Sequence, residues 1–138
     1  MYKRQIPTRY GSPWYKNELP EKTSVYMNGR ETYKFAVMAM SDNIKELMQQ
    51  AGVSGEDVAL VIPHQANYRI INEARRRIPD IAPEKFCINI DRYGNTSSAS
   101  IPLCICEEVE QGRIRPGDKV LAVGFGGGLT VGATILQF

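Results

Sequence analysis

The 138-residue chain predicts an α/β fold with a mostly parallel sheet. Apolar residues recur at helical spacing in several segments, and a continuous apolar run has the length of a buried strand. Predicted helices and strands also alternate along the chain, as they do in layered α/β domains. The content of 43% hydrophobic and 23% charged residues is ordinary for a globular protein. The sequence therefore predicts one domain with a hydrophobic core.

The first half of the chain contains two predicted helices and one strand. The first thirty residues show no clear period and are expected to form a loop and a short extended piece. Apolar residues recur at three- and four-residue steps over residues 31–51, which predicts a helix that Gly52 ends. The apolar run 57–62 predicts a strand buried on both faces. Residues 66–77 predict a helix whose basic end suits the negative end of the helix dipole, and Pro79 closes it.

The second half continues the alternation of strands and helices. Residues 86–90 predict a short strand. The four polar residues 95–98 offer N-cap oxygens for a helix that runs to about Glu110. The chain is then expected to finish in a strand over 119–124, a tight turn at the three glycines 126–128, and a final antiparallel strand over 129–138.

Charge and hydropathy exclude some classes of partner. A net charge of +2 implies no attraction of the whole chain to nucleic acid or to a membrane surface. No apolar run approaches the roughly 20 residues that span a bilayer, and no signal-peptide pattern opens the chain. The three cysteines, Cys87, Cys104 and Cys106, lack metal-type spacing with the only histidine. They predict reduced, buried thiols in a cytoplasmic protein.

Two polar residues follow predicted strands and are candidates for chemistry. His64, the only histidine, comes directly after a buried strand, where open α/β sheets bind their ligands. A lone histidine is more often structural, but a neutral imidazole can also transfer a proton or stabilise an oxyanion. Asn95 follows the next predicted strand. It can be read as an N-cap, or as a neutral donor to an enolate oxygen.

A glycine turn and a basic cluster complete the candidate features. The glycines 126–128 lack the βαβ context of a phosphate-binding loop. They predict a tight hairpin, or a turn that lets a backbone N–H approach a reacting centre. Arg69 and the run 75–77 form the one local basic cluster. Such a run is usually a solvated helix face, and the alternative is a docking site for an acidic partner.

Four motifs resemble those of the β-ketoacyl-ACP synthase III family. Residues 64–70 (HQANYRI) resemble its HQANxRI motif, and residues 91–102 (DRYGNTSSASIP) resemble its YGNTSxAS(I/V)P motif. Residues 124–130 (GFGGGLT) resemble its glycine loop, and residues 27–37 resemble its MNGRE-xx-KFAV stretch. The resemblance runs from about residue 6 to residue 138 with the motifs in order, which is far more specific than any single motif.

The resemblance implies a thiolase-like fold, of which this chain would be the C-terminal half. We expect a mostly parallel sheet with an antiparallel final strand and helices on both faces. The implied reaction is decarboxylative condensation of an acyl-CoA primer with malonyl-ACP, which starts fatty-acid synthesis without a cofactor or a metal. The implied partners are acyl carrier protein and coenzyme A thioesters, and the full-length protein is expected to form a homodimer.

The resemblance also implies roles for individual residues. His64 and Asn95 would promote decarboxylation of the malonyl group and stabilise the enolate oxygen. The backbone N–H of Gly127 would help to form the oxyanion hole. The carrier protein would dock on the sequence from Gln65 through Ala66, Asn67 and Tyr68 to Arg69. Within this surface, Asn67 would approach the pantetheine arm and Arg69 would face acidic residues of the carrier.

The nucleophilic cysteine of the family belongs to its N-terminal half and has no counterpart among the three cysteines here. We therefore expect this chain to be inactive alone for the full condensation. Residues 1–5 (MYKRQ) match what a common transposase-type sequencing adapter encodes from an alternative start codon. We expect these residues to be adapter-derived, the gene to be cut at its 5′ end, and residues 6–138 to be the domain.

Two other readings stay open. The chain could be a non-catalytic or partner subunit of a heteromeric ketosynthase, whose cysteine-bearing half has its own gene. It could also be a relative of the plant-type polyketide synthases, which share the histidine and asparagine. Their glycine loop usually reads GFGPG, and Gly127 stands where their proline would be, so the synthase III reading is favoured.

Overall fold

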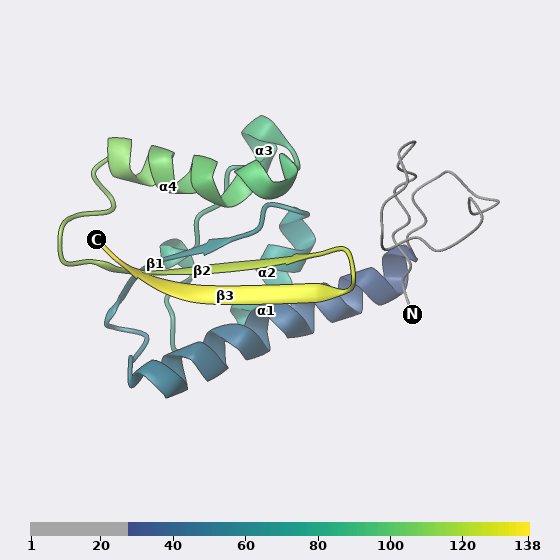
Figure 1. The fold of residues 1–138 in the computed structure, drawn as a ribbon, viewed down its shortest axis with the longest axis horizontal. Coiled ribbons are helices and arrows are strands. Elements are labelled where there is room, and N and C mark those ends of the chain that lie inside the picture. Colours follow the sequence, from purple (N-terminus) through teal and green to yellow (C-terminus); the bar gives the residue numbers. More distant parts are fainter. Residues whose placement is uncertain (1–27) are drawn as a thin grey trace, which may run out of the picture.

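The computed structural model of the chain describes residues 28–138, and Figure 1 shows their arrangement. Residues 1–5, expected to be adapter-derived, lie outside the described part. The elements in chain order are α1 (Gly29–Ala51), β1 (Val58–Pro63), α2 (Tyr68–Arg76), a 3-10 turn (Pro83–Lys85), α3 (Ile90–Tyr93), a second 3-10 turn (Ser97–Ala99), α4 (Ser100–Glu110), β2 (Lys119–Gly126) and β3 (Thr130–Gln137).

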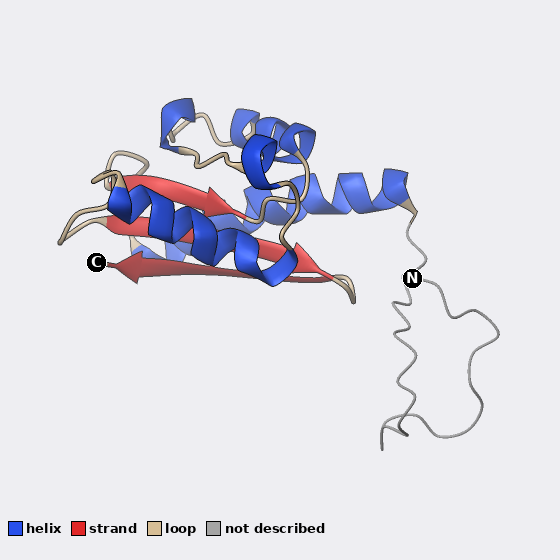
Figure 2. Ribbon diagram, turned by 90° about the horizontal axis from the view of Figure 1, so that it is seen from above, coloured by secondary structure: helices blue, strands red, loops and turns tan. Residues whose placement is uncertain are grey.

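The described strands form one mixed sheet in the order β1-β2-β3, and Figure 2 shows the three strands side by side behind α4. β1 and β2 are parallel, with Pro63 opposite Val123 at their carboxyl ends. β3 returns antiparallel along β2, in continuous register from Gly126 opposite Thr130 to Lys119 opposite Gln137. The strands predicted over 57–62 and 119–124 and the final antiparallel hairpin are confirmed.

Helices cover both faces of this sheet, with α1 and α2 on one side and α4 on the other (Figure 1). The side chains of β1 divide between the two layers, because successive residues of a strand point to opposite faces. Val61 packs with the α1 and α2 side chains, whereas Ile62 packs with Cys104 of α4. These apolar contacts stabilise the fold by about 1.5–3 kcal/mol for each large side chain that is fully buried.

Helix α1 follows the apolar spacing of its sequence. The Asn28 side chain accepts a hydrogen bond from the Glu31 backbone N–H at its start, as an N-cap does. Gly52 ends the helix in the left-handed conformation, with φ of 63°, which glycine adopts without steric strain. Met40 and Ile44 are fully buried against the sheet. The predicted helix and its glycine stop are confirmed.

The strand predicted over residues 86–90 is wrong. Only Phe86 pairs with β1, through an isolated parallel bridge to Val61. Beyond it the backbone bonds to a side chain: Gln65 Nε2 donates to the Cys87 carbonyl at 3.2 Å, and Gln65 Oε1 accepts from the Asn89 N–H at 3.1 Å. Because this amide satisfies the backbone groups, the segment needs no neighbouring strand there, and α3 begins at the next residue.

The expected caps of the helix ending at Glu110 also differ. α4 starts at Ser100, and its N-cap residue, Ala99, makes no side-chain capping bond. The polar residues before it form the 3-10 turn Ser97–Ala99 instead. Asn95 Oδ1 accepts the Ser97 N–H at 2.9 Å, so its oxygen serves this turn rather than α4. Among the described residues, no helix is long and apolar enough to cross a membrane.

Candidate active site

The carboxyl ends of β1 and β2 bring two motif segments to one edge of the sheet. His64 follows the last residue of β1, and its backbone N–H donates to the Val123 carbonyl of β2 at 2.8 Å. β2 itself ends at Gly126, where the glycine turn begins. The parallel pairing of these strands therefore places the histidine beside the glycine loop, at the edge where open α/β sheets bind ligands.

An open cavity of about 1010 Å³ lies at this edge. Its lining includes His64 and Asn95, together with Asn67 and the glycine loop with Gly127. Ala66, from the same motif as His64, also lines it. The structure thus gathers around one cavity five of the eight residues that the sequence singled out. Gln65, Tyr68 and Arg69 are not part of this lining.

The His64 ring is half-buried and held on two sides. Its Nδ1 lies 2.6 Å from the Ser100 hydroxyl oxygen, and the ring meets Phe125 edge-on, with centroids 5.3 Å apart and planes at 71°. Burial lowers the pKa of His64 below its ordinary value, because a charged imidazolium loses hydration there. The ring is therefore in its neutral form around pH 7.

The orientation of the Asn95 amide follows from one hydrogen bond. Its Oδ1 accepts from the Ser97 backbone N–H, so this atom is the oxygen and the amide nitrogen points elsewhere. The nitrogen has no hydrogen-bond partner among residues 28–138, and the side chain is exposed at the cavity. Asn95 can therefore donate to a bound molecule without breaking a contact within the described fold.

The expected carrier-docking residues separate into exposed and buried ones. Tyr68 and Arg69 are exposed, in the first turn of α2. Asn67 caps that helix, since its Oδ1 accepts the Arg69 N–H at 2.8 Å. Gln65 has no exposed surface, and both ends of its amide bond within the protein. Its side chain holds the segment after β1 rather than facing a partner.

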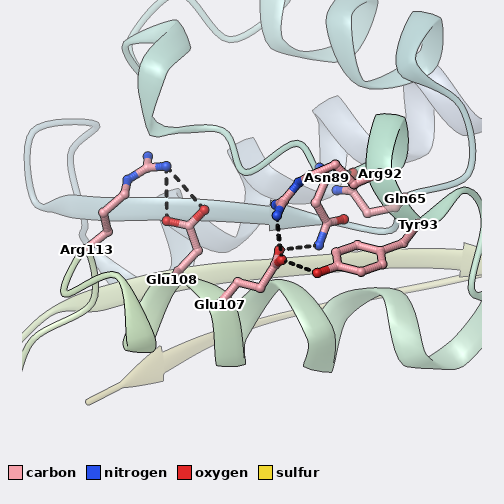
Figure 3. A network of polar contacts seen from close by, with 7 residues as sticks. All are labelled: Gln65, Asn89, Arg92, Tyr93, Glu107, Glu108 and Arg113. Carbon is pink, nitrogen blue, oxygen red and sulfur yellow. Dashed lines mark hydrogen bonds and ion pairs between the residues drawn. The ribbon is translucent and has the colours of Figure 1, made fainter.

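A polar network between α3 and α4 was not anticipated from the sequence (Figure 3). The Glu107 carboxylate of α4 accepts from Asn89 Nδ2 at 2.7 Å and from the Tyr93 hydroxyl at 2.7 Å. It also pairs with the Arg92 guanidinium at 2.8 Å. These donors lower the pKa of Glu107, the Asn89 bond having the largest effect. Only the three-dimensional packing shows this role of Glu107, because its partners lie 14 to 18 residues away along the chain.

The cysteines do not provide a nucleophile at the cavity. Cys87 and Cys104 are buried, as expected, but Cys106 is exposed on α4, which corrects the prediction that all three are buried. A side-chain contact with Cys104, together with burial, raises the pKa of the Cys87 thiol far above its usual range. A thiol held protonated is a poor nucleophile. No group of three or more potential metal ligands occurs within residues 28–138.

Solved structures share this fold. Beta-ketoacyl-[acyl carrier protein] synthase III from Thermus thermophilus matches with a TM-score of 0.81 and 52% identity, over 85% of this chain and 36% of that one. 3-Oxoacyl-[acyl-carrier-protein] synthase III from Aquifex aeolicus matches with a TM-score of 0.79 and 46% identity, over 83% and 37%. The fold is therefore the thiolase-like α/β fold of these synthases, as the resemblance implied.

Within the proteins of thiolase-like fold, the sequence comparisons identify one family. The family model described as the C-terminal part of 3-oxoacyl-[acyl-carrier-protein (ACP)] synthase III matches residues 48–138. The beta-ketoacyl-[acyl-carrier-protein] synthase III of Bacillus pumilus is 49% identical over 120 residues, which cover 87% of this chain. That of Clostridium perfringens strain 13 is 44% identical over 126 residues, or 91% of the chain. The chain belongs to the β-ketoacyl-ACP synthase III family, and it spans 38% and 39% of the length of these two relatives.

Proposed function

We propose that this chain supplies the decarboxylating half of a β-ketoacyl-ACP synthase III site. The complete site would join an acyl-CoA primer to malonyl-ACP at the start of fatty-acid synthesis in the cytoplasm, with no cofactor. One observation carries the proposal: His64 and Asn95 line the same cavity at the carboxyl ends of the strands, each with a nitrogen unused by the described fold.

The first step would be loss of carbon dioxide from the malonyl thioester. The bond between the α-carbon and the carboxylate breaks, and its electron pair stays behind as an enolate with negative charge on the thioester oxygen. Two neutral donors, His64 and Asn95, would stabilise that charge without holding the starting carboxylate strongly. This is selective stabilisation of the transition state. Each donor is expected to contribute about 3–4 kcal/mol, or roughly two to three orders of magnitude in rate.

The second step would form the new carbon–carbon bond. The enolate carbon attacks the carbonyl of an acyl group carried on a cysteine thiolate, the carbonyl oxygen becomes an oxyanion, and the thiolate leaves as the carbonyl re-forms. The Gly127 backbone N–H would donate to this oxyanion. The cysteine must come from outside this chain, because Cys87 and Cys104 are buried and the exposed Cys106 does not line the cavity. The chain alone would then be inactive in the full condensation.

Carrier protein would approach from the side of α2. Arg69 is exposed in the first turn of that helix and has no ion-pair partner among the described residues. Its charge is thus available to the acidic surface expected of an acyl carrier protein. Tyr68 lies beside it, and Asn67 and Ala66 line the cavity that would receive the pantetheine arm. The complete protein is proposed to act as a homodimer.

Reconstitution with a cysteine-bearing half tests the catalytic roles. In the Bacillus pumilus relative, the segment that this chain matches is replaced by this chain, so that the N-terminal part of the relative supplies the cysteine. Condensation of a short acyl-CoA with malonyl-ACP is then measured. His64→Ala and Asn95→Ala should each lower the condensation rate by roughly two to three orders of magnitude, while acylation of the upstream cysteine continues. Asn72→Ala, an amide outside the cavity lining, is the control. Unchanged condensation in both site variants would refute the assigned roles.

A non-catalytic role as the partner subunit of a heteromeric ketosynthase is the second candidate. The burial of Cys87 agrees with this candidate as well as with the first, because in both the nucleophile lies outside this chain. Co-expression with a separate cysteine-bearing half discriminates the two. In the partner-subunit case, His64→Ala and Asn95→Ala should leave assembly and activity of the complex unchanged. A plant-type polyketide synthase activity would instead appear as repeated extension of the primer.

A further inference from the structure

The Gln65 amide lies beside the candidate site and bonds only inside the protein. Its side chain has no exposed surface. Nε2 donates to the Pro63 carbonyl at 2.9 Å and to the Cys87 carbonyl at 3.2 Å, and Oε1 accepts from the Asn89 N–H at 3.1 Å. Because a carbonyl only accepts and a backbone N–H only donates, these partners fix which end of the amide is the nitrogen. Both N–H donors and the oxygen of Gln65 are therefore in use.

This amide bridges two segments at the point where their backbone pairing ends. β1 meets the later segment through the isolated bridge between Val61 and Phe86, and the Cys87 N–H donates to the Val61 carbonyl at 2.9 Å. Beyond Cys87, no backbone–backbone hydrogen bond joins the two segments within the described part of the chain. The Gln65 side chain thus continues the connection where the strand pairing stops.

The two ends of the bridge lie close in sequence to the two candidate donors. Gln65 is the residue after His64. Asn89 is the N-cap residue of α3, a helix of four residues whose C-cap is Gly94, and Asn95 follows directly. A shift of Asn89 would therefore pass through one helical turn to Asn95, while a shift of Gln65 would reach His64 at once.

We propose that Gln65 is a positioning residue that sets the separation of the His64 and Asn95 side chains. It does not line the cavity, so it acts through its neighbours and not on a bound molecule. This inference rests on the proposed function, because the separation of the two donors matters only if they bind one oxygen atom. Displacement of such a donor by about 1 Å can cost about 100-fold in rate. The proposal gives Gln65 a different role from the carrier docking that the resemblance implied.

Hydrogen exchange tests the bridge in the unaltered 138-residue protein. The Asn89 N–H has no backbone acceptor among residues 28–138, as is usual at the start of a helix. Its exchange, followed by amide nuclear magnetic resonance, should nevertheless be as slow as that of the buried amides of β1, because Gln65 holds it. Gln65→Met keeps the length of the side chain without its polar atoms and should remove this protection. An Asn89 amide that exchanges freely in the unaltered protein overturns the proposal without any variant.

The reconstituted enzyme tests the effect on catalysis. Gln65→Met should lower kcat for condensation by about 100-fold, while the KM for malonyl-ACP and acylation of the upstream cysteine stay unchanged. Gln49→Met, the same change at an exposed position of α1, is the control and should alter none of these. A raised KM with unchanged kcat would indicate carrier docking, and a lower urea midpoint of unfolding with unchanged kcat would indicate a purely structural role. Either result overturns the proposal.

Gln65→Glu is the conservative variant and keeps the test decisive if Gln65→Met does not fold. It retains the length of the side chain and one acceptor oxygen. Buried beside two carbonyl oxygens, the introduced carboxyl is expected to stay protonated, and its O–H can donate to only one of them. We expect kcat to fall by about tenfold, the scale of one lost hydrogen bond, with KM unchanged. An unchanged kcat in this variant contradicts the assigned role.

The exchange measurement and the catalytic assays can fail separately. If His64→Ala and Asn95→Ala condense normally, the proposed function is refuted, and the bridge from Gln65 to Asn89 still stands on its own measurement. If those two variants are impaired but Gln65→Met condenses at the wild-type rate, the positioning role of Gln65 alone is refuted.

Discussion

The Tyr93 hydroxyl donates a hydrogen bond to Glu107 Oε1 at 2.7 Å and so ties helix α3, just before Asn95, to helix α4. The same carboxylate accepts from Asn89, whose backbone N–H is held by the buried Gln65. Gln65 is the residue after His64 in the chain. A continuous set of hydrogen bonds therefore connects the segments that carry both candidate donors, and Glu107 is its meeting point (Figure 3).

Removing the Glu107 charge should loosen this connection. Glu107→Gln keeps the size of the side chain but replaces one acceptor oxygen by an NH₂ group. At either position this group faces a donor of Arg92 and one of a second residue, Tyr93 or Asn89. We expect a lower urea midpoint of unfolding at pH 7. Glu110→Gln, an exposed change on the same helix, is the matched control and should have a much smaller effect. Equal midpoints for the two variants would show that the network does not stabilise the fold.

Acid should remove the difference between the wild-type protein and Glu107→Gln. The pKa of Glu107 is lower in the folded protein than in the unfolded chain, chiefly because of the Asn89 hydrogen bond. Its contribution to stability is then fully present above the ordinary carboxyl pKa and is lost as the pH falls through the lower, folded-state value. Urea midpoints measured from pH 7 down to about pH 3 should converge. A constant difference across that range would contradict the assignment.

Much of the fold could be predicted from the sequence because the pattern and the packing agree. The apolar spacing of α1 and its stop at Gly52, the buried β1 run and the final hairpin all appear as expected. The convergence of His64 and Asn95 at one cavity was also expected, although the strand predicted before Asn95 is reduced to an isolated bridge at Phe86.

The remainder depends on contacts between residues far apart in sequence. Periodicity indicated a strand over residues 86–90, but no local pattern shows that the Gln65 amide will satisfy its backbone groups. The contact between His64 and Ser100 spans 36 residues. It depends on how α4 packs against the sheet, so neither residue type alone could indicate it.

The burial of His64 predicts a pH dependence of stability near neutrality. Its pKa is lower in the folded protein than in the unfolded chain, so the unfolded chain takes up the proton first as the pH falls. Stability should therefore decrease as the pH is lowered from about 6.5 toward the folded-state pKa. His64→Gln should flatten this slope in urea titrations between about pH 7.5 and 5.5. A wild-type protein that gains stability over this range would contradict the prediction.

Charge reversal at Arg69 should weaken the use of carrier protein selectively. In the reconstituted enzyme, Arg69→Glu is expected to raise the KM for malonyl-ACP much more than that for the acyl-CoA primer, because Arg69 belongs to the proposed docking surface of the carrier and does not line the cavity. Arg77→Glu makes the same charge change just beyond the other end of α2, where Arg77 is its C-cap residue, and should have little effect. Similar effects of Arg69→Glu on both substrates would count against carrier docking at this end of the helix.

Gly55 should be the least replaceable glycine of the described fold for steric reasons. A Cβ atom there would lie 1.8 Å from the Asp80 carbonyl oxygen and 3.2 Å from the Ile81 backbone nitrogen. Both atoms belong to the backbone, so no side-chain rotation relieves the overlap. Gly55→Ala is expected to lower the free energy of unfolding by at least about 2 kcal/mol, as measured by urea titration at pH 7.

Gly29→Ala provides the matched control, because a Cβ atom at this position in the first turn of α1 meets nothing within 4 Å. Alanine favours the helix over glycine by up to about 1 kcal/mol, so the control should leave stability unchanged or slightly raised. If both variants unfolded at the same urea concentration, the turn before β1 would not approach Asp80 as closely as the structure has it. A large loss confined to Gly55→Ala would confirm that this contact joins the two loops at the amino end of the sheet, opposite the cavity.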